Sequence, residues 1–209
     1  MENRLVCNCG CADFGRIVAH SMGSQILLRS IDSLRPAFDH RLGFNNNRRV
    51  RLGHVIFANP DVSASVFETK VANLAPFAQR VTIYASANDG VLTVSKTFRG
   101  NVPRAGQIEQ YRPVFIIENQ TVEVVDITGA PISLFNPDRY FGKYHSAFTH
   151  PAVVEDIKTL FTNTDTDEDN PSPGERAKTM DRPDNFIEMD YSINGRKGKF
   201  WKLLGERTN

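Results

Sequence analysis

Four short apolar runs constrain the fold of this chain more than any other feature of its sequence. They lie at residues 16–19, 54–58, 80–85 and 122–127. The runs around Ile56 and Ile83 are apolar almost throughout, which is typical of strands covered on both faces in a parallel sheet. Helical patterns occupy residues 24–34, 66–77, 89–98 and 151–161. This alternation predicts an α/β fold with a mainly parallel sheet.

Composition divides the 209 residues into four segments. Residues 1–15 are expected to be a mobile N-terminal segment, and residues 16–161 an α/β domain with one core. Residues 162–185 are rich in Asn, Asp, Glu, Pro, Ser and Gly, which predicts a disordered linker. Residues 186–209 are interpreted as a C-terminal tail of unknown role, in which Asn194-Gly195 indicates a short hairpin.

Charge and hydropathy exclude several classes of function. The net charge is +1, and no basic run is interleaved with aromatic residues, so we expect no binding to nucleic acid. No stretch of about 18 apolar residues could span a bilayer and no signal-peptide core opens the chain, which favours a cytoplasmic protein. Cys7, Cys9 and Cys11 are too close for an ordinary disulfide framework and lack a nearby fourth ligand. We therefore expect neither a metal nor a cofactor.

A serine lies between the first strand and the first helix of the predicted fold. Ser21 has the small residue Ala19 two positions before it and Gly23 two positions after it. This spacing is typical of a nucleophile elbow, a turn expected to be so tight that only small side chains fit. Such a turn lifts the serine hydroxyl above the sheet edge, where the backbone N–H of Met22 could stabilise an oxyanion. An ordinary turn capped by serine is the alternative.

A nucleophilic serine needs an imidazole to take its proton and an acid to orient that imidazole. Asp89 follows the strand at 80–85, at the carboxyl edge where parallel sheets place their ligands. It is the favoured acid, although Asp is also a common helix N-cap. Asp61, which follows the preceding strand, is the alternative acid.

Five histidines compete for the role of base. His145 lies on the loop beyond the last strand of the predicted sheet and ahead of the helix at 151–161, which suits a base. His150 is the alternative, although its place beside Pro151 also suits a helix start. His20 is adjacent to Ser21 and cannot fold back onto its hydroxyl.

Five motifs together resemble a known family. They are VAHSMG at 18–23, ANPDV at 58–62, YASAND at 84–89, PRAG at 103–106 and YHSAF at 144–148. With them, the chain from 16 to 161 resembles the α/β-hydrolase superfamily, in a bacterial branch of unknown function. The order Ser, Asp, His agrees with that superfamily. The resemblance implies a Ser21-Asp89-His145 triad and acyl transfer through an acyl-enzyme on a small-molecule substrate.

The same resemblance predicts an incomplete fold, the C-terminal half of an α/β hydrolase. Hydrolases of this type place several strands and a second oxyanion donor before the nucleophile strand, whereas fifteen residues precede Arg16 here. The strand at 16–19 would then be an exposed apolar edge. Two hypotheses follow: a serine esterase with impaired activity, or a non-catalytic remnant that self-associates or binds a partner chain through this edge.

Overall fold

The computed structural model describes residues 14–38, 51–129, 145, 147–162, 182 and 185–204. Its main sheet has six strands in the order β1-β2-β3-β6-β10-β7. Their bounds are β1 Phe14–His20, β2 Arg51–Ala58, β3 Ala78–Ala85, β6 Val122–Asp126, β10 Lys199–Leu203 and β7 Phe186–Met189. Each pair from β1 to β10 is parallel, and β7 runs antiparallel to β10. The mainly parallel sheet predicted from the sequence is confirmed.

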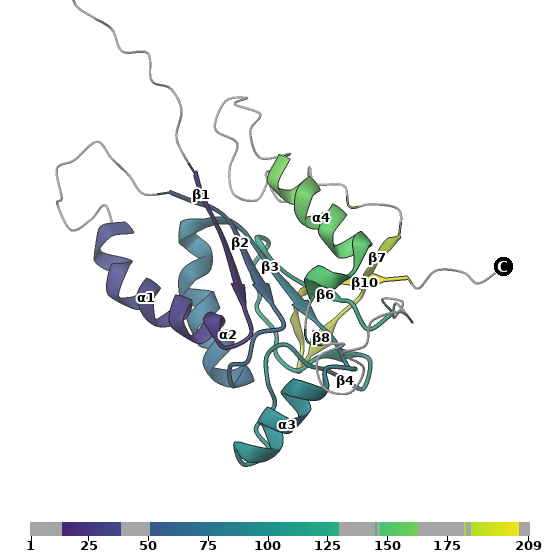
Figure 1. The fold of residues 1–209 in the computed structure, drawn as a ribbon. Coiled ribbons are helices and arrows are strands. Elements are labelled where there is room, and N and C mark those ends of the chain that lie inside the picture. Colours follow the sequence, from purple (N-terminus) through teal and green to yellow (C-terminus); the bar gives the residue numbers. More distant parts are fainter. Residues whose placement is uncertain are drawn as a thin grey trace, which may run out of the picture.

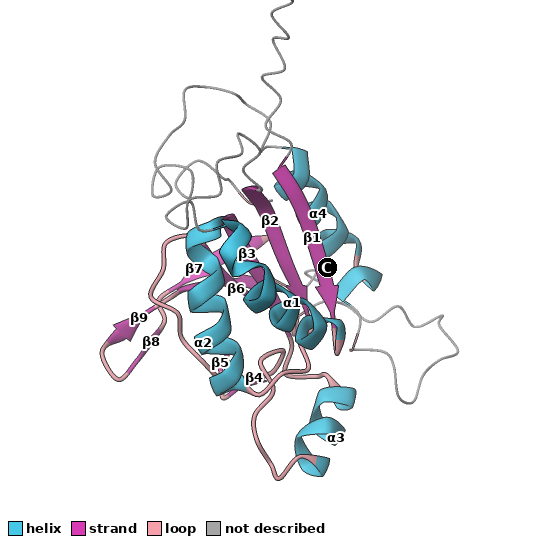
Figure 2. Cartoon of the chain, turned by 90° about the vertical axis from the view of Figure 1, so that its left-hand side faces the viewer, coloured by secondary structure: helices cyan, strands magenta, loops and turns pink. Residues whose placement is uncertain are grey.

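Helices cover both faces of this sheet. Helices α1 (Gly23–Phe38) and α2 (Ala64–Leu74) lie on one face, and α4 (Pro151–Thr162) lies on the other (Figure 1). Helix α3 (Gly90–Phe98) lies beyond the carboxyl ends of the strands, below α1 and α2 in Figure 2. Among the described helices, none is both long enough and apolar enough to cross a membrane.

Alternate residues of the central strands enter two separate cores. In β2, Val55 and Phe57 join the core beneath α1 and α2, whereas Ile56 and Ala58 join the core beneath α4. All four side chains are fully buried. Successive side chains of a strand point to opposite faces, so a strand with helices on both faces must be apolar throughout. This arrangement explains the run that predicted the sheet.

Helix α2 ends earlier than the pattern at 66–77 predicts. It stops at Leu74, and a 3₁₀ turn, η2 (Ala75–Phe77), continues the chain into β3. Pro76 is the cause, because proline has no N–H to donate to the preceding turn of an α-helix.

The separation of 186–209 from the domain as a tail is wrong for residues 186–204. Strands β7 and β10 extend the main sheet, and Phe200 and Leu203 enter the two cores. The expected hairpin does form, between β8 (Ser192–Ile193) and β9 (Arg196–Lys197), with positive φ at the two turn residues between them. A second small hairpin pairs β4 (Ile108–Glu109) with β5 (Arg112–Pro113).

One residue of the predicted disordered linker is buried in the domain. Arg182 forms ion pairs with Glu123 of β6 and with Asp156 of α4, and Glu123 also pairs with Arg80 at 2.5 Å. Burial opposes ionisation of Glu123, but the guanidinium groups of Arg182 and Arg80 outweigh it and hold the pKa of Glu123 below its ordinary value. Tyr84 donates a hydrogen bond to Asp156 at 2.5 Å. Arg182 thus links the sheet to α4.

Candidate active site

Ser21 occupies the turn between β1 and α1 with an unusual backbone. Its φ angle is 52°, in the left-handed region that a non-glycine residue enters only when its surroundings hold it there. Two contacts from the end of β2 and the residues after it do so. The Ser21 N–H donates to Ala58 at 3.0 Å, and the Ser21 carbonyl accepts from the N–H of Asp61 at 3.2 Å. The strand-turn-helix geometry of an elbow is therefore present.

The prediction that the turn is too tight for a side chain larger than that of Gly23 is wrong. A Cβ atom built at Gly23 meets no heavy atom within 4 Å in the described part of the chain, its chain neighbours and own helix backbone aside. The α1 end of the turn therefore has room for a larger side chain. Ala19, at the other end of the turn, is buried.

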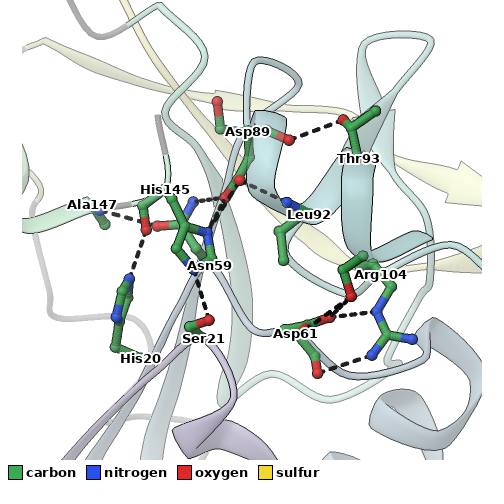
Figure 3. Close-up of polar contacts among 12 residues, drawn as sticks. His20, Ser21, Asn59, Asp61, Asp89, Leu92, Thr93, Arg104, His145 and Ala147 are labelled. Atoms are coloured by element: carbon green, nitrogen blue, oxygen red, sulfur yellow. Dashed lines mark hydrogen bonds and ion pairs between the residues drawn. The ribbon is translucent and has the colours of Figure 1, made fainter. Parts of the chain in front are cut away.

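The imidazole of His145 lies between Ser21 and Asp89 (Figure 3). Its Nε2 atom is 2.7 Å from the Ser21 hydroxyl, and its Nδ1 atom is 2.9 and 3.1 Å from the two carboxylate oxygens of Asp89. A carboxylate can only accept, so Nδ1 carries the proton and Nε2 accepts from the serine. This is the protonation that a general base next to a serine requires.

Asp89 makes the contacts expected of both roles that the sequence leaves as alternatives, helix N-cap and partner of an imidazole. It is the N-cap of α3, where its Oδ1 atom accepts the Leu92 N–H at 2.9 Å. The same side chain contacts His145, and its Oδ2 atom also accepts from Asn59 at 3.0 Å. Because Asp89 is buried, these donors replace the water that would otherwise solvate the carboxylate.

The structure places the alternative acid, Asp61, in a different cluster. Its Oδ1 atom accepts from Arg104 Nε at 2.6 Å and from Ser95 Oγ at 2.8 Å. The backbone of Asp61 contacts Ser21, as described above, and its carbonyl accepts from Gln25 at 2.6 Å. The backbone of Asp61 therefore supports the elbow, and its side chain is directed to Arg104 instead of His145 (Figure 3).

The alternative base, His150, lies at the start of α4. Its Nδ1 atom accepts from the N–H of Ala152 at 3.2 Å, and its carbonyl accepts from Val154 at 3.0 Å. These are the contacts of a helix-capping residue, and the structure brings His145 to Ser21 instead.

Two residues beside Ser21, His145 and Asp89 are not predicted by the sequence pattern. His20 donates from Nε2 to the carbonyl of His145 at 2.6 Å, and the two rings lie 5.0 Å apart. Asn59 contacts both Asp89 and Ala147. The sequence feature that could have indicated Asn59 is its position: it directly follows β2, as Ser21 directly follows β1. His20 is recognisable in the sequence only as the neighbour of Ser21, because its contact with the His145 carbonyl depends on the fold.

The expected oxyanion donor, Met22, directly precedes α1. In the described part of the chain, no acceptor contacts its backbone N–H. No group of three or more His, Cys, Asp or Glu in the described residues could hold a metal ion. Cys7, Cys9 and Cys11 lie outside those residues.

Comparison with known proteins agrees with this fold. The model of a family described as "Alpha/beta hydrolase of unknown function (DUF900)" matches residues 15–155, more than half of the chain. The match spans Ser21, Asp61, Asp89 and His145. No curated protein and no solved structure matches the chain. The protein therefore belongs to this family of α/β hydrolases of unknown function.

Proposed function

We propose that this protein is a serine hydrolase that cleaves an ester or a related acyl bond. The observation that carries the proposal is the unbroken line of hydrogen bonds from Ser21 through His145 to Asp89. A serine hydroxyl becomes a useful nucleophile when an oriented imidazole can take its proton. The membership in an α/β-hydrolase family supports the same reaction class.

The proposed reaction has two halves. In the first, Ser21 Oγ attacks the substrate carbonyl while its proton passes to His145 Nε2, and Asp89 stabilises the imidazolium. His145 then gives that proton to the departing alcohol, which leaves an acyl group on Ser21. In the second half, His145 takes a proton from water as the water oxygen attacks the acyl carbonyl. His145 then returns that proton to Ser21 Oγ, which leaves as the acid is released.

The tetrahedral intermediates of both halves carry a negative oxygen. We assign the backbone N–H of Met22 to this oxygen, because it directly follows the nucleophile and has no acceptor in the described structure. Because this N–H lies at the start of α1, the positive end of the helix dipole also stabilises the negative oxygen.

The test is hydrolysis of a short activated ester, p-nitrophenyl acetate, by the purified full chain. Ser21→Ala should remove nearly all of the turnover, because nucleophile and base act as a unit. The matched control is Ser30→Ala, the same change on the exposed side of α1. Equal turnover by the wild type and Ser21→Ala would reject the function.

The second candidate is an interaction module that pairs with a second copy of itself. Strand β1 lies at the edge of the sheet, and Val18, Met22 and Ile26 are 43%, 57% and 69% exposed. Two identical edges can pair around a two-fold axis. Size-exclusion chromatography with light scattering tests this candidate. The interaction module should be a dimer that Val18→Asp dissociates. A monomer at all concentrations would contradict it.

A further inference from the structure

We propose that Asn59 is a positioning residue that holds the acid and the base of the triad in register. The inference rests on the proposed serine-hydrolase function. Asn59 would act without contact to the substrate, through hydrogen bonds to Asp89 and to the segment that carries His145.

A single side-chain amide connects these two segments. Asn59 Nδ2 donates to Asp89 Oδ2 at 3.0 Å, and Asn59 Oδ1 accepts the N–H of Ala147 at 3.0 Å. Ala147 is two residues beyond His145, on the same short segment. Asn59 itself is fully buried. One rigid group of three heavy atoms therefore sets the distance between the acid and the backbone that carries the base.

The chemistry of the two partners requires an amide at this position. A carboxylate oxygen can only accept and a backbone N–H can only donate, so the residue between Asp89 and Ala147 must donate at one end and accept at the other. Asparagine does both with a short side chain. Aspartate would satisfy Ala147 but would place a second oxygen against Asp89.

The backbone of Asn59 is fixed as firmly as its side chain. Its φ angle is 46°, which Asn tolerates better than most residues, and its N–H donates to Tyr84 at 2.9 Å. Gly106 packs directly on it, since a Cβ at Gly106 would lie 2.6 Å from the Asn59 carbonyl carbon. The Gly106 N–H also donates to Pro60 at 2.9 Å. The amide thus extends from an immobilised point.

The segment that carries His145 is also held by His20. The His20 ring donates to the His145 carbonyl at 2.6 Å, while Asn59 holds Ala147. Among described titratable side chains, Asp89 and His20 contact His145 directly, along with the hydroxyl of Ser21. Two strand ends, those of β1 and β2, therefore fix the orientation of the imidazole before substrate arrives, which lowers the barrier to proton transfer.

The experiment compares three variants of the full chain with the wild type. Asn59→Gly removes the hydrogen bonds to Asp89 and Ala147 and keeps a residue that accepts positive φ. Asn101→Gly is the matched control, because Asn101 also has positive φ, at 59°, but is exposed. Asn59→Asp keeps the acceptor for Ala147 and removes the donor to Asp89. For each, kcat and KM for p-nitrophenyl acetate are measured across pH, with the unfolding midpoint as a check of folding.

A positioning role predicts a loss in kcat and little change in KM. Asn59→Gly should lower kcat roughly 10- to 100-fold, and Asn101→Gly should match the wild type. In Asn59→Asp, the new carboxylate lies beside that of Asp89, and the two can stay in hydrogen-bond contact only while they share a proton. Loss of that proton at alkaline pH should therefore lower kcat/KM, which adds a descending limb to the pH profile. A purely structural role for Asn59 would not produce this limb. An Asn59→Gly enzyme with wild-type kcat, or an Asn59→Asp profile that follows the wild type, would overturn the inference.

A second measurement separates this inference from the proposed function. If the wild type shows no Ser21-dependent turnover, the function fails, but the proton NMR signal of the His145 Nδ1–H still reports the geometry. We expect Asn59→Gly to broaden or shift this signal and Asn101→Gly to leave it in place. An unchanged signal in Asn59→Gly would reject the positioning role whatever the activity.

Discussion

One oxygen of Asp89 serves both His145 and the N-terminus of α3. Its Oδ1 atom lies 3.1 Å from the His145 ring and also accepts the N–H of Leu92 at 2.9 Å. Substitutions at this position can therefore separate the effect on catalysis from the effect on folding.

Asp89→Asn should reduce kcat roughly 10³- to 10⁴-fold, because an amide cannot stabilise the imidazolium and can favour the wrong tautomer. The unfolding midpoint should change little, since asparagine is as good an N-cap as aspartate. Asp89→Ala should lose activity to a similar extent and also about 1 kcal/mol of stability. Kinetics and thermal unfolding of the two variants check both parts.

The comparison at Asp61 tests the choice of acid. Asp61→Asn removes the charge that pairs with Arg104, so it should lower the free energy of unfolding. It should retain measurable activity, with a pH dependence of kcat/KM like that of the wild type. If Asp61→Asn is inactive and Asp89→Asn is active, the acid has been assigned to the wrong residue.

The prediction of the fold depended on local patterns, and its errors concern distant contacts. The strands β2 and β3 were recognisable because both faces of each are buried, which leaves an apolar run. Strand β10 mixes charged and apolar residues and lacks a continuous apolar run, and it lies 73 residues after the end of β6, its parallel neighbour (199 − 126). Nothing local shows that it joins the same sheet. Arg182 is equally unrecognisable, because its carboxylate partners are on β6 and α4.

The candidate site was easier to predict than its supports. Ser21, Asp89 and His145 each lie directly after a strand or in the loop beyond one, and parallel strands bring such positions to one edge. The sequence presents helix N-cap and acid as alternative roles for Asp89, although one carboxylate has lone pairs for both sets of contacts. The role of Asn59 is not predictable from the sequence, because an uncharged amide next to a strand end indicates no chemistry until its hydrogen-bond partners are known.

Arg182→Ala should be strongly destabilising. Removal of this guanidinium leaves two buried carboxylates, Glu123 and Asp156, without a shared counter-charge, which costs about 3–5 kcal/mol. Lys158→Ala, which breaks the exposed pair with Glu155, is the control and should change the free energy of unfolding far less. Denaturant unfolding of both variants decides whether 182 belongs to the folded domain, and equal stabilities would show that it does not.

Stability should fall between pH 6.5 and pH 4 through His54. Burial, together with the charge of Arg80, lowers the pKa of His54 from 6.5 to about 4. Below pH 6.5 the imidazole of His54 is protonated in the unfolded chain but stays neutral in the folded protein. The free energy of unfolding therefore falls by up to about 3 kcal/mol by pH 4. His54→Gln cannot titrate and should flatten this part of the curve. A wild-type curve that is flat over this window would contradict the buried neutral imidazole.

Substitution by alanine should be destabilising at Gly106 and tolerated at Gly23. Gly106→Ala forces a Cβ to within 2.6 Å of the Asn59 backbone, so it should lower stability by about 1–3 kcal/mol and reduce kcat. Gly23→Ala meets no atom within 4 Å in the described structure and should be tolerated. Unfolding midpoints and kcat of the two variants provide the check, and an inactive, unfolded Gly23→Ala would restore the steric explanation of the elbow.

The most direct test of the account is covalent labelling of the purified chain with a fluorophosphonate probe, followed by mass spectrometry of its peptides. The account predicts one adduct, on Ser21, whose rate of formation falls steeply in His145→Ala and which is absent from Ser21→Ala. Labelling that persists in Ser21→Ala, or a wild-type protein that remains unlabelled under conditions in which an ordinary serine esterase reacts, would contradict the claim that Ser21 is an activated nucleophile.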